Sequence, residues 1–230
     1  MAIDIEALKK QAAKAAVDLI DNGMIVGLGS GSTAAYAVIS LAERVKAGLK
    51  IKAIPTSEQT KLLAIRNSIE LTSFAQNSTI DITIDGADQV ELSSLNLIKG
   101  LGNALLREKI VARASKKLVI MVDERKIVDR LGNKSPLPVE IIPFGWEVTQ
   151  KAIEKFCPSS KLRLDKRGKP VITDSDHYVL DCLIPQINNA EKLDQDLKLI
   201  TGVVETGLFI KMTNIVFVAT ESGLEQLQSK

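Results

Sequence analysis

Two aspartates that end a predicted strand are the first residues whose types and spacing suggest chemistry. They belong to the run Asp85-Gly86-Ala87-Asp88, and the isoleucines at alternate positions before it are typical of a buried strand. Open α/β sheets bind ligands at the carboxyl ends of their strands, so both carboxylates are expected there. Paired carboxylates transfer protons or bind magnesium, and Asp81 would add a third oxygen. An Asx turn leaving the strand explains the same residues without chemistry.

A loop rich in glycine and serine, Gly29-Ser30-Gly31-Ser32-Thr33, lies between a predicted strand and a predicted helix. The N–H groups of such a loop and of the following helix N-terminus converge on one point, which favours an anion such as phosphate. The alternative is a tight turn in which Ser32 or Thr33 caps the helix. Ser32 stands where the dinucleotide pattern Gly-x-Gly-x-x-Gly needs its third glycine, which argues against NAD.

A lysine and a glutamate flank the start of another predicted helix. The run Lys99-Gly100-Leu101-Gly102-Asn103 joins a cation to flexible backbone, and Glu108 follows on a helix expected over residues 104–114. Helical spacing allows Glu108 to share the side that faces the lysine loop, which makes it a candidate base. The alternative for Arg107-Glu108-Lys109 is a solvated helix face.

The composition excludes several function classes. The chain has 230 residues, 45% of them hydrophobic, and 30 basic against 28 acidic residues, so nucleic-acid binding is not indicated. The one histidine, His177, lies in a predicted turn and offers no Ser-His-Asp or Cys-His arrangement. With only Cys157 and Cys182 besides, a tetrahedral zinc site is not expected.

The same features predict a reduced, cytoplasmic protein. Two cysteines are too few for a disulfide framework, and no apolar run approaches the 18 residues of a membrane span. The amphipathic stretch Ile3–Lys14 lacks the apolar core of a signal peptide.

The first half of the chain alternates between predicted strands and helices, which favours a mostly parallel sheet covered by helices. The expected strands are 24–28, 51–54, 69–74, 80–85 and 118–123, and the expected helices are 5–20, 34–44, 58–67 and 103–114. The pattern changes after Gly132, where Ser135-Pro136-Leu137-Pro138 interrupts the chain. We therefore expect a main domain of residues 1–131 and 207–230, with a smaller α+β domain inserted at 132–206.

Taken in order along nearly the whole chain, these motifs resemble the type A ribose-5-phosphate isomerase family. The resemblance rests on Gly29–Ala34, Asp85–Asp88, Lys99-Gly100, Leu105–Ile110, Pro136–Glu140 and Gly202–Phe209. It implies a Rossmann-like main domain and interconversion of D-ribose 5-phosphate and D-ribulose 5-phosphate in the pentose phosphate pathway. It also implies a homodimer or homotetramer that uses neither a metal nor an organic cofactor.

The resemblance assigns roles to single residues. It places the base at Glu108 and further catalytic groups at Asp85, Asp88 and Lys99. The expected substrate contacts are Ser30, Gly31, Ser32, Thr33, Gly86, Ala87, Gly100, Leu101, Gly102, Lys126 and, more weakly, Lys9. These types suit the reaction, because a carboxylate can move the proton and a lysine can stabilise the enediolate.

Several positions depart from the family pattern. Leu101 and Asn103 interrupt a run of glycines that usually follows the lysine, Gln89 replaces a common glutamate, and Lys134-Ser135 stands where an aromatic is usual. A re-specialised isomerase therefore remains an alternative. We expect φ at Leu101 to be negative, since leucine would be strained in a left-handed conformation.

Two rivals come from other classes. A sugar-phosphate sensor would need a DNA-reading module, for which about 23 residues before the first strand are too few. A magnesium-dependent phosphoryl transferase built on Asp81, Asp85 and Asp88 would need a P-loop, and the sequence has none.

Overall fold

The structure, a computed structural model, describes residues 4–229 and divides into two compact units. Unit 1 comprises Met1–Ala87, Arg107–Lys126 and Met212–Lys230, and unit 2 comprises Asp88–Leu106 and Ile127–Lys211. Ile3, with which the N-terminal amphipathic stretch was expected to open, lies outside the described residues. No helix among residues 4–229 is long and apolar enough to cross a membrane.

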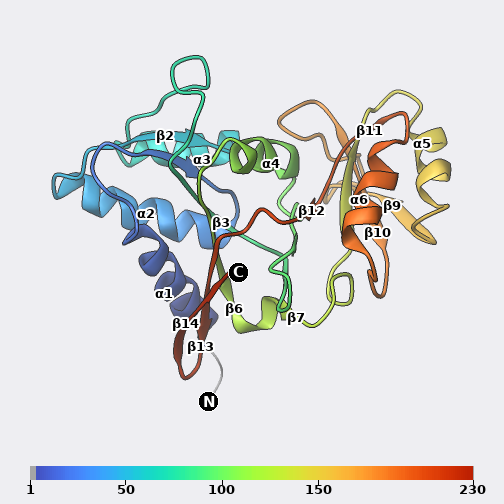
Figure 1. Cartoon of the computed structure of the whole chain (residues 1–230). Coiled ribbons are helices and arrows are strands. Elements are labelled where there is room, and N and C mark those ends of the chain that lie inside the picture. Colours follow the sequence, from blue (N-terminus) through green and yellow to red (C-terminus); the bar gives the residue numbers. More distant parts are fainter. Residues whose placement is uncertain (1–3, 230) are drawn as a thin grey trace. The chain divides into compact units, whose positions relative to one another are not determined.

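A six-stranded sheet forms the centre of unit 1 (Figure 1). Its order is β14 (Gly223–Gln228), β13 (Ile215–Thr220), β6 (Leu118–Asp123), β3 (Ile82–Gly86), β1 (Ile25–Leu28) and β2 (Lys52–Pro55). All neighbours are parallel except β14, which forms an antiparallel hairpin with β13. The expectation of a mostly parallel, Rossmann-like sheet is confirmed.

Helices cover this sheet because each presents one apolar stripe. They are α1 (Ile5–Val17), α2 (Ser32–Lys46), α3 (Glu58–Arg66) and α4 (Leu105–Arg113). Leu41 of α2 is fully buried in a cluster that includes Val17 of α1 and Met121 of β6. Burial of such a leucine stabilises the fold by about 2 kcal/mol. Val111 of α4 packs instead with Ile54 and Ile80, which fixes the helix that carries Glu108.

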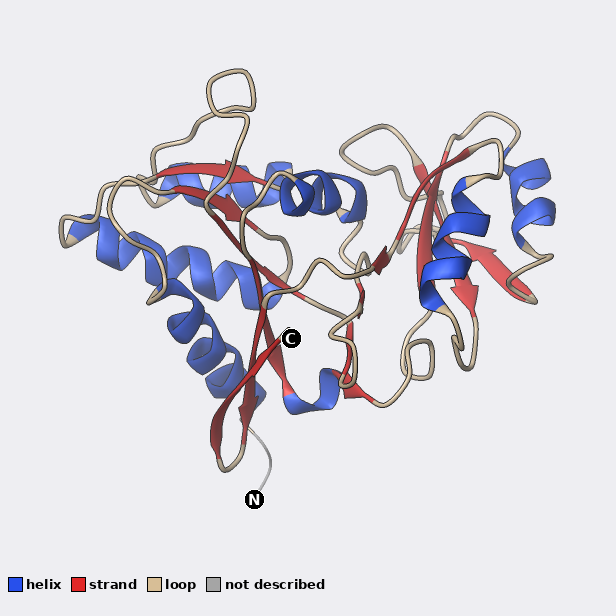
Figure 2. Cartoon of the chain, viewed as in Figure 1, coloured by secondary structure: helices blue, strands red, loops and turns tan. Residues whose placement is uncertain are grey.

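Unit 2 contains two smaller sheets, whose strands are red in Figure 2. The first has the order β11 (Val203–Thr206), β8 (Leu137–Ile141), β10 (Tyr178–Leu183), β9 (Ser159–Leu162). The second has the order β12 (Leu208–Phe209), β5 (Leu97–Ile98), β4 (Gln89–Glu91), β7 (Ile127–Val128). The helices α5 (Trp146–Ile153) and α6 (Ala190–Lys198) contribute Ile153 and Leu197 to the core of this unit.

The second sheet explains why unit 2 takes in a segment that we had expected in the main domain. The strands β4 and β5, within residues 88–106, pair with β7 and β12 of the same unit. The pairing of β5 with β12 joins Ile98 to Leu208, and the pairing of β4 with β7 joins Val90 to Ile127; strand periodicity does not disclose either pairing.

Two local predictions were wrong. Residues 69–74 form no strand and make one isolated bridge, between Leu71 and Ala53. The proline-rich segment that was expected to interrupt the chain instead enters β8, an inner strand. Pro138 has no N–H to donate, but its carbonyl accepts from Gly207 N at 2.7 Å. Proline is tolerated here because the neighbouring segment, at Gly207, needs a hydrogen-bond acceptor from residue 138 and not a donor.

Candidate active site

The predicted site residues divide between the two units, and each group is described within its own unit. Unit 1 holds Ser30–Thr33, Asp85–Ala87, Glu108 and the lysines at 9 and 126. Unit 2 holds Asp88 and the stretch Lys99–Gly102.

The Gly/Ser loop leads from β1 directly into α2, which begins at Ser32. The N-cap residue is Gly31, with φ of 95°, and it offers no side chain to the first N–H groups of the helix. The alternative prediction, that Ser32 or Thr33 caps the helix, is therefore wrong. An N-terminus with no side-chain cap leaves N–H donors for an anion, as the phosphate interpretation requires.

The hydroxyl of Ser30 is held by a cluster of hydroxyl groups from the link between β2 and α3 and from the first turn of α3. Its Oγ lies 2.8 Å from Thr56 Oγ1, 2.7 Å from Ser57 Oγ and 3.2 Å from Thr60 Oγ1. Thr60 in turn donates to the carbonyl of Gly29 at 2.9 Å. Sequence reasoning missed this cluster, although Thr56-Ser57 follows a strand in the same way as the Gly/Ser loop. Ser30 thus positions the loop, and the exposed Ser32 presents its side chain to solvent.

Asp85 lies at the carboxyl end of β3, as predicted, and is only 1% exposed. Its Oδ1 accepts from Ser30 N at 3.2 Å and from Gly86 N at 2.7 Å. A Cβ at Gly29 would lie 2.0 Å from that same oxygen. The carboxylate and the Gly/Ser loop are therefore in such close contact that only glycine fits between them.

Asp81, which was considered as a third magnesium ligand, does not join Asp85. It precedes β3, and the rise over four positions of extended strand places it about 13 Å from Asp85. Its carboxylate accepts from Ile25 N at 2.9 Å and from Lys116 Nζ at 2.8 Å. Hydrogen bonds from Lys116 and from the Ile25 N–H lower its pKa. The same two bonds connect the residue before β3 to the start of β1 and to the segment before β6. Among the described residues, no three His, Cys, Asp or Glu side chains gather into a metal-binding group.

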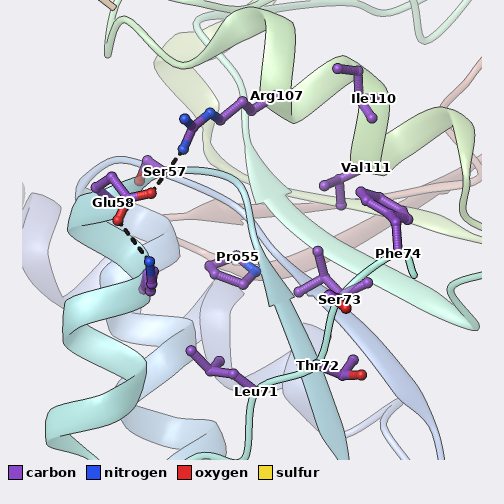
Figure 3. Close-up of a pocket in the computed structure, with 12 residues that line it drawn as sticks. Pro55, Ser57, Glu58, Leu71, Thr72, Ser73, Phe74, Arg107, Ile110 and Val111 are labelled. Atoms are coloured by element: carbon purple, nitrogen blue, oxygen red, sulfur yellow. Dashed lines mark hydrogen bonds and ion pairs between the residues drawn. The ribbon is translucent and has the colours of Figure 1, made fainter. Parts of the chain in front are cut away.

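Glu108 is buried in the first turn of α4, with 4% of its surface exposed. This burial rules out the solvated-face interpretation, and Lys109 beside it is also buried. The preceding Arg107 faces outward, and its Nη1 lies 3.1 Å from Glu58 Oε1 at the start of α3 (Figure 3). Hydrogen bonds from Lys61 and Arg107 hold the pKa of Glu58 below its ordinary value, so the pair stays charged. The helix that carries Glu108 is thus anchored at its N-terminal turn.

A cavity of about 470 Å³ lies beside this ion pair, between α4 and the residues that follow β2 (Figure 3). Apolar side chains, among them Pro55, Phe74 and Ile110, form most of its wall. Its lining contains none of the predicted site residues. Its contribution to the candidate site is indirect, through Ser57 of the hydroxyl cluster and Arg107 next to the candidate base.

Lys126 ends a short 3₁₀ turn, Glu124–Lys126, that directly follows β6. Burial of Asp123 would raise its pKa, but hydrogen bonds and charge from Arg125 outweigh burial, so the pKa is lowered. The Arg125 Nε to Asp123 Oδ1 distance is 2.7 Å. This pairing fixes the turn that presents Lys126. The weaker candidate, Lys9, makes an ion pair with Glu6 at 3.0 Å.

In unit 2, Lys99 follows β5 and is 3% exposed. Its N–H donates to the Gly207 carbonyl at 2.9 Å, and its Nζ lies 5.5 Å from the centre of the Phe209 ring. The carboxylate of Asp88 accepts from Leu101 N at 3.0 Å. The lysine loop and Asp88 are therefore brought together within this unit.

The backbone of the lysine loop resolves the question of Leu101. The residues with positive φ in this loop are Gly100, at 111°, and Asn103, at 65°, whereas Leu101 is not among them. The predicted negative φ of Leu101 is confirmed. Asparagine tolerates the left-handed conformation better than most residues, so neither substitution of the glycine run strains the loop strongly.

His177 has a structural environment, as expected. It closes the turn after Thr173, and its Nδ1 lies 3.0 Å from Oε1 of the buried Glu140. Both residues belong to unit 2, where they connect β8 to the turn that precedes β10.

Comparison with known proteins decides the family. The sequence profile described as Ribose 5-phosphate isomerase A (phosphoriboisomerase A) matches residues 52–223. The chain belongs to the ribose 5-phosphate isomerase A family. Among named relatives, ribose-5-phosphate isomerase A of Gloeobacter violaceus is 51% identical over 225 residues, covering 98% of this chain and 97% of the relative. The Gluconobacter oxydans protein of the same name is 48% identical and covers 96% of each chain.

Solved structures of ribose 5-phosphate isomerases share the whole fold. The enzyme from Methanocaldococcus jannaschii superposes with a TM-score of 0.93 at 40% identity, covering 97% of this chain and 99% of its own. A D-ribose-5-phosphate isomerase in complex with phospho-erythronic acid gives a TM-score of 0.94 at 40% identity, covering 98% and 100%. The fold predicted from the resemblance is thereby confirmed over both units.

Proposed function

We propose that this chain interconverts D-ribose 5-phosphate and D-ribulose 5-phosphate through an enediolate, with Glu108 as the base. The observation that carries the proposal is a carboxylate buried in α4 at the matched family position, within a chain similar over 98% of its length to a named isomerase. The relative that binds phospho-erythronic acid supports the substrate class. That ligand carries a phosphate and, at the other end, a carboxylate that resembles the charge of an enediolate.

The reaction moves the carbonyl between C1 and C2 of the sugar. In the aldose, Glu108 takes the proton from C2, the C2–H electron pair forms the C1–C2 double bond, and the carbonyl oxygen at C1 gains the negative charge. The same carboxyl group then returns the proton to C1, the C2 hydroxyl loses its proton and becomes the new carbonyl, and the oxygen at C1 gains a proton and becomes a hydroxyl. Burial of Glu108 favours this proton transfer. Once protonated, a carboxyl group shielded from water keeps the proton until it is returned to C1.

The remaining charged residues stabilise and reshuffle charge on the oxygens. The ammonium group of Lys99 interacts more strongly with the enediolate than with the neutral sugar, which lowers the barrier. The carboxylates of Asp85 and Asp88 pass hydroxyl protons and assist ring opening. Asp85 suits this role because two backbone N–H groups already fix one of its oxygens.

The phosphate is held far from the reacting carbons and supplies binding energy that sets the position of C1 and C2. We assign it to the N–H groups at the start of α2, with the side chains of Ser32 and Thr33. Lys126 adds the cationic contact, and Lys9 is a weaker candidate.

Three further properties are proposals here: two follow from the family resemblance, and the cytoplasmic location follows from the low cysteine content. The chain assembles as a homodimer or homotetramer, it acts in the cytoplasm, and it needs neither a metal nor an organic cofactor. Sedimentation of the purified protein tests the first. Activity retained after exhaustive chelation tests the last, and it also separates the isomerase from a magnesium-dependent phosphoryl transferase.

The decisive experiment measures ribulose 5-phosphate formation by purified wild type and Glu108→Gln. Glutamine keeps the shape but cannot accept the proton, so turnover should fall by roughly 10²–10⁴-fold with substrate binding nearly unchanged. Glu43→Gln, at an exposed position of α2, is the matched control and should behave as wild type. A Glu108→Gln enzyme within threefold of wild type would reject Glu108 as the base.

A further inference from the structure

The lysine loop of unit 2 is held by hydrogen bonds from the side chain of Arg163, a residue about sixty positions further along the chain. We call these contacts the grip. Its Nη1 lies 2.8 Å from the Gly100 carbonyl, 2.6 Å from Asn103 Oδ1 and 3.3 Å from the Leu101 carbonyl. One end of the guanidinium therefore binds three oxygens of a single tight turn.

The other end of the guanidinium is fixed by a carboxylate. Arg163 Nε donates to Asp181 Oδ2 at 2.9 Å and Nη2 donates to Asp181 Oδ1, so the pair is bidentate. The side chains are 11% and 23% exposed, respectively. The backbone of Arg163 is held as well, since its N–H donates to Val179 O and its carbonyl accepts from Val171 N, each at 2.9 Å. The planar fork of arginine suits this geometry, and lysine does not reproduce it.

The loop is thus restrained on both sides. The carbonyls of Gly100 and Leu101 accept from Arg163, while the N–H of Leu101 donates to Asp88 at 3.0 Å. The same turn directly follows Lys99. A shift of this turn would therefore move both an ammonium group and a carboxylate that the proposed mechanism uses.

Asn103 adds a side-chain contact with Arg163 to the loop. The family usually has glycine in this run, and glycine supplies the left-handed φ but no side-chain acceptor. Asn103 supplies both, with φ of 65° and an Oδ1 at 2.6 Å from Arg163. The departure from the glycine run therefore adds a contact to the loop rather than only removing flexibility.

We propose that Arg163, oriented by Asp181 and joined by Asn103, is a positioning residue for isomerisation that holds Lys99 and Asp88 in place through the loop. The inference rests on the proposed function of the chain. Because Lys99 acts mainly on the enediolate, loosening the loop lowers kcat more than it raises KM.

The test compares steady-state kinetics and thermal melting of wild type, Arg163→Lys and Asn103→Gly. We expect Arg163→Lys to lower kcat by about 10–100-fold with KM within threefold, because a misplacement of about 1 Å can cost that much. Asn103→Gly retains the backbone conformation and removes only the acceptor, so kcat should fall by about 3–10-fold, the net size of one typical hydrogen bond. Asn103→Asp, which keeps an acceptor, should restore kcat to within about threefold of wild type.

Arg167→Lys, at an exposed position of the same hairpin, is the matched control and should leave both constants unchanged. Hydrogen exchange at residues 100–103 should quicken in Arg163→Lys and Asn103→Gly only.

Wild-type kcat in Arg163→Lys, or a kcat loss that merely follows the loss of folded protein, would overturn the positioning role. Wild-type kcat in Asn103→Gly would remove Asn103 from it. A wild-type protein without isomerase activity would reject the proposed function instead, and the hydrogen-exchange comparison would still report on the grip.

Discussion

The two ligand loops each contain a glycine whose surroundings can be compared, Gly29 in unit 1 and Gly102 in unit 2. In the Gly/Ser loop of unit 1, Gly29 is required by close approach, because a Cβ would lie 2.0 Å from the Asp85 carboxylate. In the lysine loop of unit 2, Gly100 has φ of 111°, and Gly102 has open space around it. Position 29 is therefore closed to a side chain by packing and position 102 is open to one, although each loop also contains a glycine with positive φ, Gly31 at 95° and Gly100 at 111°.

The loops also differ in what holds them. Neutral hydroxyl groups and the Asp85 carboxylate fix the Gly/Ser loop from beneath, and its outer N–H groups stay available at the start of α2. An arginine and an aspartate, both charged, fix the lysine loop. In the Gly/Ser loop the hydroxyl groups hold the Ser30 side chain without adding charge, and the Asp85 carboxylate accepts from the Ser30 N–H, two residues before the start of α2.

The largest expected effect comes from breaking the close approach with Gly29→Ala. The added methyl group must displace the Asp85 carboxylate or the backbone, which should cost about 1–3 kcal/mol of stability and roughly 10²-fold in kcat/KM. Urea unfolding and steady-state kinetics check both values. Gly102→Ala is the comparison, since neither φ nor space opposes it, and its unfolding free energy should change by less than about 0.5 kcal/mol. Equal stability losses in the two variants would remove the distinction between the loops.

An intermediate effect is expected for the phosphate side of unit 1. Lys126→Ala should weaken binding of ribose 5-phosphate by roughly 1.5–3 kcal/mol, as for the loss of a charge-assisted contact, and should hardly affect free ribose. Calorimetry with both sugars measures the difference. Lys166→Ala, at an exposed position of unit 2, serves as the charge-matched control. If both sugars lose affinity equally, Lys126 does not contact the phosphate.

The smallest effect is expected for Leu101→Gly. Because φ of Leu101 is not positive and its side chain is 40% exposed, glycine relieves no strain and opens no cavity. The ratio kcat/KM should change by less than about tenfold, or 1.4 kcal/mol. A much larger gain in the kinetic assay would show that leucine impairs this loop and that the chain is a re-specialised member of its family.

Two other departures from the family pattern contact each other. Gln89 Nε2 donates to Ser135 Oγ at 2.7 Å and to the Ser135 carbonyl at 3.1 Å, while its Oε1 accepts from Gly132 N at 2.8 Å. A glutamate, once ionised, has no donor for the carbonyl. Gln89 and Ser135, the serine that stands where an aromatic is usual, are therefore hydrogen-bonded to each other. Considering the two positions separately in the sequence does not reveal this contact.

Local sequence was sufficient for the elements that carry the site. The alternating isoleucines placed Asp85 at the end of β3, and the predicted strand 118–123 coincides with β6. The glycine spacing located both loops, and the helix after the lysine loop was expected in the correct place. These features depend on backbone preference and on the period of apolar residues, both of which are written in a few consecutive positions.

Only the tertiary structure decided which groups hold those loops. The hydroxyl of Ser30 meets Thr56, Ser57 and Thr60 across β1 and β2, and Arg163 reaches the lysine loop from a hairpin about sixty residues away. Asp81, which is four positions before Asp85 in sequence, is separated from it because the intervening strand is extended. Proximity in these cases depends on strand pairing and on side-chain direction across long separations, so no spacing within the chain encodes it.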